Sequence, residues 1–415
     1  MPDSHHRMLT ALLRASHLTT FEQLPAVVAE YASRAGFEAV RIYVCDLRED
    51  MLREVTGEGL DAGRGGRELR IDGTLAGRTF QTLQASFGAT EGRRLHWLPL
   101  LDGTERLGVL SVTTREEPDG ETRETMGDLA SLVGMMLVST RSHSDSYARL
   151  TRLEPMSVSA EMQWSLMPPR TFTSPRVTIA AAMEPAYATA GDAFDYALAA
   201  DIAHLAVFDA MGHDTAAGLT ANLAMATCRN QRRQGASITQ ARDIIETMLI
   251  EQFTHDRYAT AVLADLDLNT GLLSWITCGH PPPILIRAGR WITTLERRPS
   301  HPLGTELGLP ALIHREHLEP GDRLLLYTDG ITEARDRTGR EFGLDHFVEF
   351  IIRHQADGFP VPETLRRLVR AVLHHHDGRL GDDATVLLCE WHGHQHPTPA
   401  EPGAAPAEGG PGNRT

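Results

Sequence analysis

The chain has 415 residues, of which 41% are hydrophobic and 23% charged, and its formal net charge is −15 at pH 7. This length predicts two or three domains, and the composition is that of a globular protein. The acidity argues against non-specific nucleic-acid binding, which depends on Lys and Arg. No stretch approaches the roughly 18 uninterrupted apolar residues of a membrane span, and the N-terminus lacks the apolar run of a signal peptide. We therefore expect a cytoplasmic protein with neither membrane nor nucleic-acid partners.

The four cysteines, Cys45, Cys228, Cys278 and Cys389, are far from one another in the sequence. None has the close Cys or His neighbours of a zinc site, so we expect small buried side chains in a reducing compartment. Cys45 and His96 could be haem or redox groups, but single residues on strand-like runs are more typical of packing.

Residues 1–141 are predicted to form an α+β sheet domain. Thr20 and Gln23 have the spacing of a capping box, which predicts a helix start. Asp102-Gly103 predicts a hairpin turn, and apolar residues from Leu129 to Leu137 repeat at the spacing of a closing helix. Strand-like runs of this domain lie at residues 40–44, 98–101 and 107–112.

Residues 142–169 are predicted to be a helical linker, and residues 170–391 a second domain. In that domain strand-like runs alternate with helical patterns, and the hairpin at Asn269-Thr270-Gly271 favours antiparallel pairing. Residues 392–415, rich in Pro, Gly and Ala, are expected to be a disordered tail. The strand-like runs lie at residues 177–183, 204–208, 259–266, 272–277, 324–328 and 385–391.

Acidic residues of the second domain stand beside glycine or another small residue, mostly at the ends of strand-like runs. They are Asp192, Asp209, Asp329 and the pair Asp382-Asp383. A single Asp beside Gly is common turn chemistry, whereas several at converging strand ends predict a site of oxygen ligands. Such ligands suit Mg²⁺ or Mn²⁺ rather than Zn²⁺. Two such ions can hold a shared water for attack on phosphorus.

Further short motifs accompany these carboxylates, in the order Met162 to Pro168, Cys278 to Pro283, Pro302-Leu303-Gly304, Gly321-Asp322, Tyr327 to Ala334 and Phe342-Gly343. Together they resemble the SpoIIE-like branch of the PP2C (PPM) serine/threonine phosphatases. The resemblance covers about Arg170 to Trp391. It implies an α-β-β-α sandwich of antiparallel sheets.

The same resemblance implies roles for individual residues. Asp209 would bridge two metal ions, and the other ligands would be Asp192, Asp329, Asp382 and the backbone carbonyl of Ala210. Asp383 would support these ligands without binding metal itself. His213 is a candidate proton donor to the leaving serine oxygen, and the alternative is a supporting hydrogen bond. Gly279 and His280 are expected to be structural.

The chain departs from the family pattern at three places. Ala190 replaces the first glycine of the family's Gly-Gly-Asp motif, and Ala193-Phe194 alters the aromatic position after it. Asp214 stands where the family has a glycine after Gly-His, and we expect it to cap the helix that follows. None of these changes removes a carboxylate.

The first domain resembles a GAF domain through the Leu75-Ala76-Gly77 turn and the strands Leu98-Pro99-Leu100 and Leu107 to Leu110. This resemblance implies a small-molecule sensor, although no residue identifies the ligand.

These patterns together predict a phosphatase that depends on two Mn²⁺ or Mg²⁺ ions and hydrolyses phosphoserine or phosphothreonine on a protein by in-line attack of water, without a covalent phosphoenzyme. The resemblance implies that its substrate is a phosphorylated STAS-type anti-sigma factor antagonist in bacterial partner switching and that the GAF-like domain regulates it. The alternative is a catalytically silent binding module of the same fold.

Two surface predictions concern helices. The stripe Leu129, Val133, Met136 and Thr140, continued by Leu150 and Leu153, suits either a homodimer through the linker or packing within its own domain, and Pro155 should end this helix. Arg229, Arg232 and Arg233 form either a docking site for an acidic partner or, as we favour, a solvated helix face.

Overall fold

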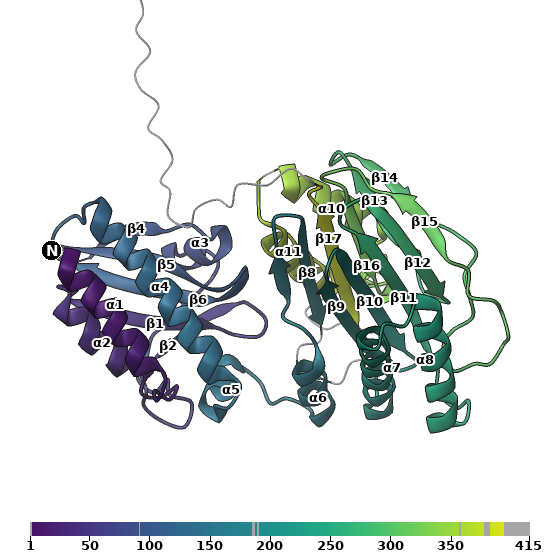
Figure 1. Ribbon diagram of the computed structural model, residues 1–415, viewed down its shortest axis with the longest axis horizontal. Helices are drawn as coiled ribbons and strands as arrows, with labels where there is room; N and C mark the ends of the chain where they lie inside the picture. Colours follow the sequence, from purple (N-terminus) through teal and green to yellow (C-terminus); the bar gives the residue numbers. More distant parts are fainter. Residues whose placement is uncertain are drawn as a thin grey trace, which may run out of the picture. The chain divides into compact units, whose positions relative to one another are not determined.

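The computed structural model describes residues 2–90, 92–184, 187–188, 191–356, 358–376 and 382–393. The chain divides into two compact units, and the division falls between Leu153 and Glu154 (Figure 1). This position lies inside the segment 142–169 that the sequence predicts as a linker. In the described residues no helix is long and apolar enough to cross a membrane.

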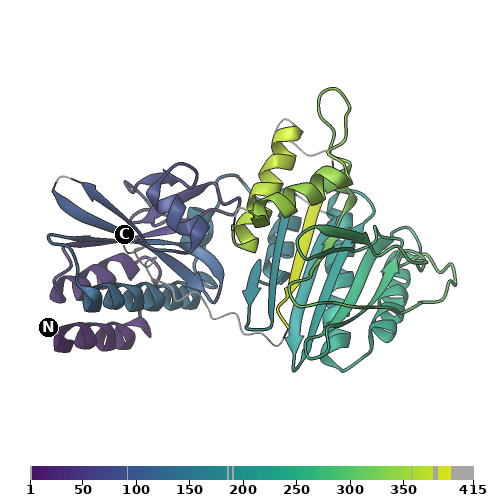
Figure 2. The ribbon, with the colours of Figure 1, turned by 90° about the horizontal axis from the view of Figure 1, so that it is seen from above.

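The first unit is built on one antiparallel sheet with the strand order β3-β2-β1-β6-β5-β4. Figure 2 shows the helices α1, α2 and α4 on one side of this sheet and α3 on the other. The strands are β1 (Ala39–Cys45), β2 (Met51–Val55), β3 (Glu68–Arg70), β4 (Ser86–Thr90), β5 (Arg93–Asp102) and β6 (Glu105–Thr114). The helices are α1 (Pro2–Ser16), α2 (Leu24–Arg34), α3 (Leu75–Thr82), α4 (Gly120–Arg141) and α5 (Asp145–Thr151).

Alternation along β1 explains why both faces of this sheet are covered. Ile42 and Val44 pack in the cluster that includes α2 and α4, whereas Tyr43 and Cys45 pack in the cluster that includes Phe80 of α3. Successive side chains of a strand point to opposite faces, so an apolar run along β1 needs helices on both sides. The unit is therefore a sheet domain of the predicted α+β class.

Two local predictions in the first unit have different outcomes. The hairpin is confirmed, because β5 and β6 pair antiparallel with Asp102 opposite Glu105. The capping box is only half formed: Gln23 Oε1 accepts the Thr20 N–H over 3.2 Å, but α2 begins at Leu24, with Gln23 at the N-cap and no side-chain cap. A proline in the first turn, which suits a helix start because its φ is already helical, takes the place of the predicted cap.

The apolar stripe of α4 is buried within its own unit. Leu129 and Val133 are fully buried and Met136 is 3% exposed, and all three belong to the core beside the sheet. The helix ends at Arg141, and α5 ends at Thr151, before Pro155 is reached. The part of the stripe on α4 therefore packs within its own unit, as its alternative predicted. Leu153 is 44% exposed, and the homodimer through the linker stays a prediction.

The second unit contains two antiparallel sheets, with the strand orders β15-β12-β11-β10-β9 and β14-β13-β16-β17-β8-β7. Figures 1 and 2 show α7 and α8 on the outer side of the first of these sheets and α10 and α11 on the outer side of the second. The unit is thus the predicted α-β-β-α sandwich, and one large apolar core includes side chains of both sheets.

The elements of this sandwich have the following bounds. The strands are β7 (Thr171–Thr173), β8 (Val177–Glu184), β9 (Asp192–Ala199), β10 (Ile202–Ala210), β11 (Ala259–Asp267), β12 (Leu272–Cys278), β13 (Ile284–Arg287), β14 (Trp291–Thr294), β15 (His314–His317), β16 (Arg323–Tyr327) and β17 (Ala384–Trp391). The helices are α6 (Val158–Leu166), α7 (Thr215–Arg233), α8 (Ile238–Phe253), α9 (Asp329–Thr332), α10 (Leu344–Ala356) and α11 (Val361–His375).

Strand β9 is not among the strand-like runs that the sequence predicts. Asp192 is the first residue of this strand, and the pairing of β9 with β10 sets Asp192 opposite Asp209. The strand contains Asp and Ala, which are infrequent in strands, so its local sequence carries a weak signal. Hydrogen bonds to β10, which pairs with β9 from Asp192 to Ala199, stabilise this strand despite its low β-propensity.

The start of the predicted tail belongs to the second unit. The backbone N–H of His392 donates to the carbonyl of Arg176 over 2.8 Å, and its Nε2 lies 2.9 Å from the hydroxyl of Thr178. The tail boundary predicted at His392 is therefore wrong for His392 and Gly393. The rest of the predicted tail, residues 394–415, lies outside the described residues.

We expect two truncations of the C-terminus to behave differently. Deletion of residues 394–415 should leave the Tm unchanged, because their composition cannot bury enough apolar surface to offset ordering entropy. Deletion of residues 392–415 should lower the Tm, because it also removes two hydrogen bonds worth about 1 kcal/mol each. Calorimetry of both truncations checks this, and equal Tm values would contradict it.

Candidate metal centre

Five carboxylates from four segments gather at one end of the second unit. They are Asp192 at the start of β9, Asp209 near the end of β10, Asp329 at the start of α9, and Asp382 and Asp383 just before β17. Register places the first two directly opposite each other. The charges of the remaining three raise the pKa of Asp209, which shows that the whole group is electrostatically connected. The structure thus brings together every carboxylate that the sequence singled out.

Asp192 is the most deeply buried member of the group. Burial raises the pKa of its carboxyl well above the usual range, and the charges of Asp209 and Asp383 raise it further. The hydroxyl of Thr328 donates to Asp192 Oδ2 over 2.7 Å, and Gln163 Nε2 donates to the Asp192 backbone carbonyl over 2.9 Å. Two residues distant in sequence therefore fix both the side chain and the backbone of Asp192.

The pKa values of Asp209 and Asp383 are also raised. Burial, followed by the charges of neighbouring aspartates, raises the pKa of Asp209 to about 7. Burial likewise raises the pKa of Asp383 to about 7, although a hydrogen bond from the Gly191 N–H to its Oδ2 acts in the opposite direction. Burial raises the pKa of Asp329 too. Such carboxylates hold protons near neutral pH unless a cation compensates their charge.

The glycine beside Asp192 is required by close packing of the backbone. A Cβ atom on Gly191 would lie 2.5 Å from the carbonyl oxygen of Gly212 and 2.6 Å from that of Ala210. The Ala210 N–H also donates to the Gly191 carbonyl over 2.9 Å. Any side chain at position 191 would therefore displace the loop that carries the Ala210 carbonyl.

The donor set fits divalent cations. Its members are carboxylate oxygens and the Ala210 carbonyl, which are the ligands that Mg²⁺ and Mn²⁺ prefer. A divalent cation would also lower the pKa values that mutual repulsion raises. Within the described residues, no group of three or more His, Cys, Asp or Glu side chains is arranged so that it could hold a metal ion. The roles of the individual carboxylates as metal ligands stay predictions.

Asp382 and His213 lie at the exposed edge of the group. Asp382 Oδ1 accepts the N–H of Asp383 over 2.9 Å, and its charge raises the pKa of Asp329. The charge of His213 lowers the pKa of Asp383, which places its imidazole within electrostatic reach. The role of His213 as a proton donor stays a prediction.

His280 has the structural surroundings that the sequence predicts. Its Nε2 donates to the Tyr327 carbonyl over 2.9 Å, and its Nδ1 accepts from the hydroxyl of Thr260 over 2.7 Å. Burial lowers the pKa of His280 to about 4, so the ring is neutral at pH 7. The residue therefore links the two sheets next to the carboxylates.

Arg229 and Arg232 are neither a docking site nor a solvated face. Both donate to the buried carboxylate of Asp195, over 2.7 Å and 2.8 Å. Because an unpaired buried carboxylate is costly, these two arginines are needed where they are, and only Arg233 of the three is exposed. The pair of contacts ties the C-terminal half of α7 to β9.

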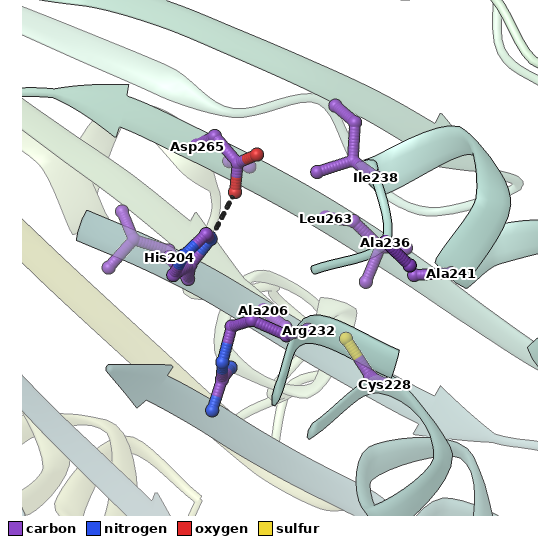
Figure 3. Close-up of a pocket in the computed structure, with 11 residues that line it drawn as sticks. His204, Ala206, Cys228, Arg232, Ala236, Ile238, Ala241, Leu263 and Asp265 are labelled. Atoms are coloured by element: carbon purple, nitrogen blue, oxygen red, sulfur yellow. Dashed lines mark hydrogen bonds and ion pairs between the residues drawn. The ribbon is translucent and has the colours of Figure 1, made fainter. Parts of the chain in front are cut away.

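A small pocket lies beneath α7 and α8 (Figure 3). His204 Nδ1 lies 2.6 Å from Asp265 Oδ1 at its edge, and Cys228 lines it. Burial raises the pKa of Cys228 to about 12, so this thiol is not a nucleophile at neutral pH. His204 stands five residues before Asp209 on β10, and the pocket is separate from the carboxylate group.

Cys45 and His96 of the first unit are both buried. Cys45 packs in the apolar cluster with Phe80, and His96 Nε2 lies 3.1 Å from the hydroxyl of Thr114. These surroundings agree with packing, which the sequence analysis favoured over a haem or redox role.

Three polar residues at the site were missed by the sequence analysis. Thr328 and Gln163 hold Asp192, and Arg257 contacts the loop after Asp209. Thr328 and Gln163 belong to the motifs Tyr327 to Ala334 and Met162 to Pro168, but the sequence does not reveal that they are buried against Asp192. Arg257 belongs to no sequence motif, and its partners Met211 and Asp214 are more than 40 residues away in the chain.

The sandwich and its carboxylate group define the class of this unit as a PP2C-type phosphatase domain. Residues 200–392 match the family model described as Stage II sporulation protein E (SpoIIE). The second unit therefore contains a SpoIIE-type PP2C domain, as the motifs predicted. No comparison tests the GAF resemblance of the first unit.

Individual relatives share part of the chain. Protein IcfG of Synechocystis sp. is 28% identical over 131 residues, which are 31% of this chain and 20% of that protein. The chain thus spans about a fifth of the length of this curated relative.

Solved structures also match. The RsbU and RsbW domains of Rv1364c from Mycobacterium tuberculosis are 25% identical, with 55% of this chain and 63% of that chain covered and a TM-score of 0.48. The PP2C domain of SpoIIE from Bacillus subtilis, with a fragment of its regulatory domain, is 20% identical, with 52% and 62% covered and a TM-score of 0.42.

We expect Thr328→Val to weaken metal binding. The substitution keeps the side-chain shape but removes the donor to Asp192 and the acceptor for the Thr385 N–H, which lies 2.9 Å away. Loss of a partner that orients a ligand costs about 10- to 100-fold in metal affinity. Calorimetric titration with Mn²⁺ measures this. Thr247→Val, whose hydroxyl bonds only within α8, is the control, and equal affinities for the two variants would contradict the assignment.

Proposed function

We propose that the chain is a Mn²⁺- or Mg²⁺-dependent protein serine/threonine phosphatase. The observation that carries the proposal is the gathering of Asp192, Asp209, Asp329 and Asp382 at strand ends, inside a unit that matches the SpoIIE family model. Asp209 would bridge two cations, and Asp192, Asp329, Asp382 and the Ala210 carbonyl would complete the ligands. Bound cations would supply an activated water and neutralise phosphoryl oxygens.

The residues of the chain have separate tasks in this proposal. Thr328 orients Asp192, and the Gly191 N–H orients Asp383, so the carboxylates are held in place before substrate arrives. His213 is exposed at the edge of the group, where it can give a proton to the leaving serine oxygen. Since water is the proposed nucleophile, no covalent phosphoenzyme forms.

The buried thiols cannot replace that water. Burial raises the pKa of Cys228 and of Cys278 to about 12, and it raises the pKa of Cys389 as well. Only a thiolate is an effective sulfur nucleophile. The chemistry of this unit therefore depends on oxygen ligands and water.

The proposed substrate is a phosphorylated STAS-type anti-sigma factor antagonist, and the proposed setting is partner switching in the cytoplasm. The resemblance to the SpoIIE-like branch supports this substrate class. Asp382 and His213 are exposed, so a phosphorylated side chain presented by a folded protein could reach them. The rival proposal, a silent binding module, predicts no hydrolysis at all.

The first unit is proposed to act as a GAF-like sensor whose state reaches the centre through α6. This helix follows the division between the units, and its Gln163 donates to the backbone carbonyl of Asp192. A shift of α6 would therefore move the backbone of a metal ligand. Such coupling between two sites is typically worth about 1 to 3 kcal/mol.

We expect Asp209→Asn to lower turnover of p-nitrophenyl phosphate at saturating Mn²⁺ by more than about tenfold, because a neutral amide cannot hold two cations. At pH 8, above the pKa of about 7, the same change should raise the Tm of the metal-free protein by removing a repelling charge. Asp201→Asn, an exposed aspartate of the same unit, is the control for both measurements. Retained turnover would contradict the metal assignment, and absence of turnover in the wild type would favour the silent module.

A further inference from the structure

The loop between β10 and α7 connects the metal-bridging candidate to a helix. Asp209 and Ala210 end the strand, and Asp214 is the N-cap of α7, where its Oδ1 accepts the Ala217 N–H over 2.8 Å. On its strand side the loop is bonded to the start of β11, since the Met211 N–H donates to the Tyr258 carbonyl over 3.1 Å. Its conformation therefore sets where the Ala210 carbonyl lies.

Arg257, which precedes β11, bonds both ends of this loop. Its Nη1 donates to the Met211 carbonyl over 3.2 Å and to Asp214 Oδ1 over 3.2 Å, and its Nη2 donates to Asp214 Oδ2 over 2.8 Å. The guanidinium is a rigid fork, so these three contacts fix the distance between Met211 and Asp214. Asp214 in turn is tied to the first turn of α7.

The partner of Arg257 is one of the residues at which this chain departs from the family pattern. The SpoIIE-like motif has a glycine at the position of Asp214, and a glycine could accept no bond from Arg257 through a side chain. The interaction is therefore a property of this chain rather than of the motif. It follows that the motif alone does not account for how this loop is held.

An ordinary surface ion pair would not hold a loop next to a metal-ligand candidate. Exposed pairs contribute about 0 to 1 kcal/mol and tolerate substitution. The pair of Arg176 with Asp201, in the same unit, has side-chain exposures of 29% and 53%, close to the 24% and 57% of Arg257 and Asp214. The difference is that Arg257 also bonds the main chain two residues after Asp209.

We propose that Arg257 is a positioning residue, which with Asp214 clamps the 210–214 loop so that Asp209 and the Ala210 carbonyl are held ready for metal. This inference rests on the proposed function. Loss of the clamp should let the loop relax without unfolding the unit, because β10, β11 and α7 keep their own hydrogen bonds.

The test compares Arg257→Gln, Arg257→Lys and Asp214→Ser with the matched control Arg176→Gln. Serine at position 214 keeps an N-cap acceptor but cannot pair with the guanidinium. For each full-length variant the Mn²⁺ affinity is measured by calorimetry, the Tm by thermal unfolding, and kcat and KM with p-nitrophenyl phosphate. A double variant of Arg257→Gln with Asp214→Ser completes a thermodynamic cycle.

We expect Arg257→Gln to weaken Mn²⁺ binding about tenfold and to lower kcat at subsaturating Mn²⁺, with KM for the small substrate unchanged. Asp214→Ser should lose part of the Mn²⁺ affinity that Arg257→Gln loses. The double variant should lose no more affinity than Arg257→Gln alone. Arg257→Lys should bind Mn²⁺ more tightly than Arg257→Gln does. Arg176→Gln should match the wild type in Mn²⁺ affinity, kcat and KM, although loss of the bonds of Arg176 to Asp201 and Asn269 should lower its Tm.

The inference is overturned if Arg257→Gln and Asp214→Ser bind Mn²⁺ as the wild type does, or if their losses are simply additive. It is also overturned if Arg176→Gln loses as much affinity as Arg257→Gln. A wild type that binds Mn²⁺ but hydrolyses no phosphoester would instead refute the proposed function, and the calorimetric comparison would still decide the clamp.

Discussion

Repulsion among the carboxylates at the strand ends is the main constraint that the structure of the second unit must satisfy. Antiparallel pairing of β9 with β10 forces Asp192 opposite Asp209, and burial strengthens their repulsion because the local dielectric is low. Directed donors hold two members of the group: the Thr328 hydroxyl donates to Asp192, and the Gly191 N–H donates to Asp383. In the proposed function, such a site would be arranged before its cations arrive and would gain stability when they bind.

The frame around this group is fixed from several directions. Helix α7 is anchored to β9 by the ion pairs of Asp195 with Arg229 and Arg232, and its first turn is tied to Arg257 through Asp214. Because both ends of the helix are held, the loop between β10 and α7 has little freedom. Helix α6 adds a contact to the backbone of Asp192 through Gln163.

Much of the sandwich could be predicted because β10, β11, β16 and β17 are apolar runs that local sequence reveals. The carboxylates could be found because each stands beside a small residue. The features that the sequence did not predict depend on contacts between distant residues. Thr328 lies 136 positions from Asp192, and β9 forms a strand because it pairs with β10. The stripe on α4 was ambiguous for a related reason, since apolar periodicity does not tell which surface it meets.

The central claim is that buried carboxylates, whose pKa values are raised by burial and by one another's charges, form a proposed site for divalent cations. The most direct measurement is calorimetric titration of Mn²⁺ at pH 6 in buffers of different ionisation enthalpy, which counts the protons released. Burial and repulsion raise the pKa of Asp209 and of Asp383 to about 7, so both are largely protonated at pH 6. Asp209 must ionise to bind metal, and bound cations would lower the pKa of the neighbouring Asp383 so that it loses its proton as well. We predict release of about one to two protons per protein, and less as the pH rises above 7. Binding without proton release, or no binding, would contradict the account.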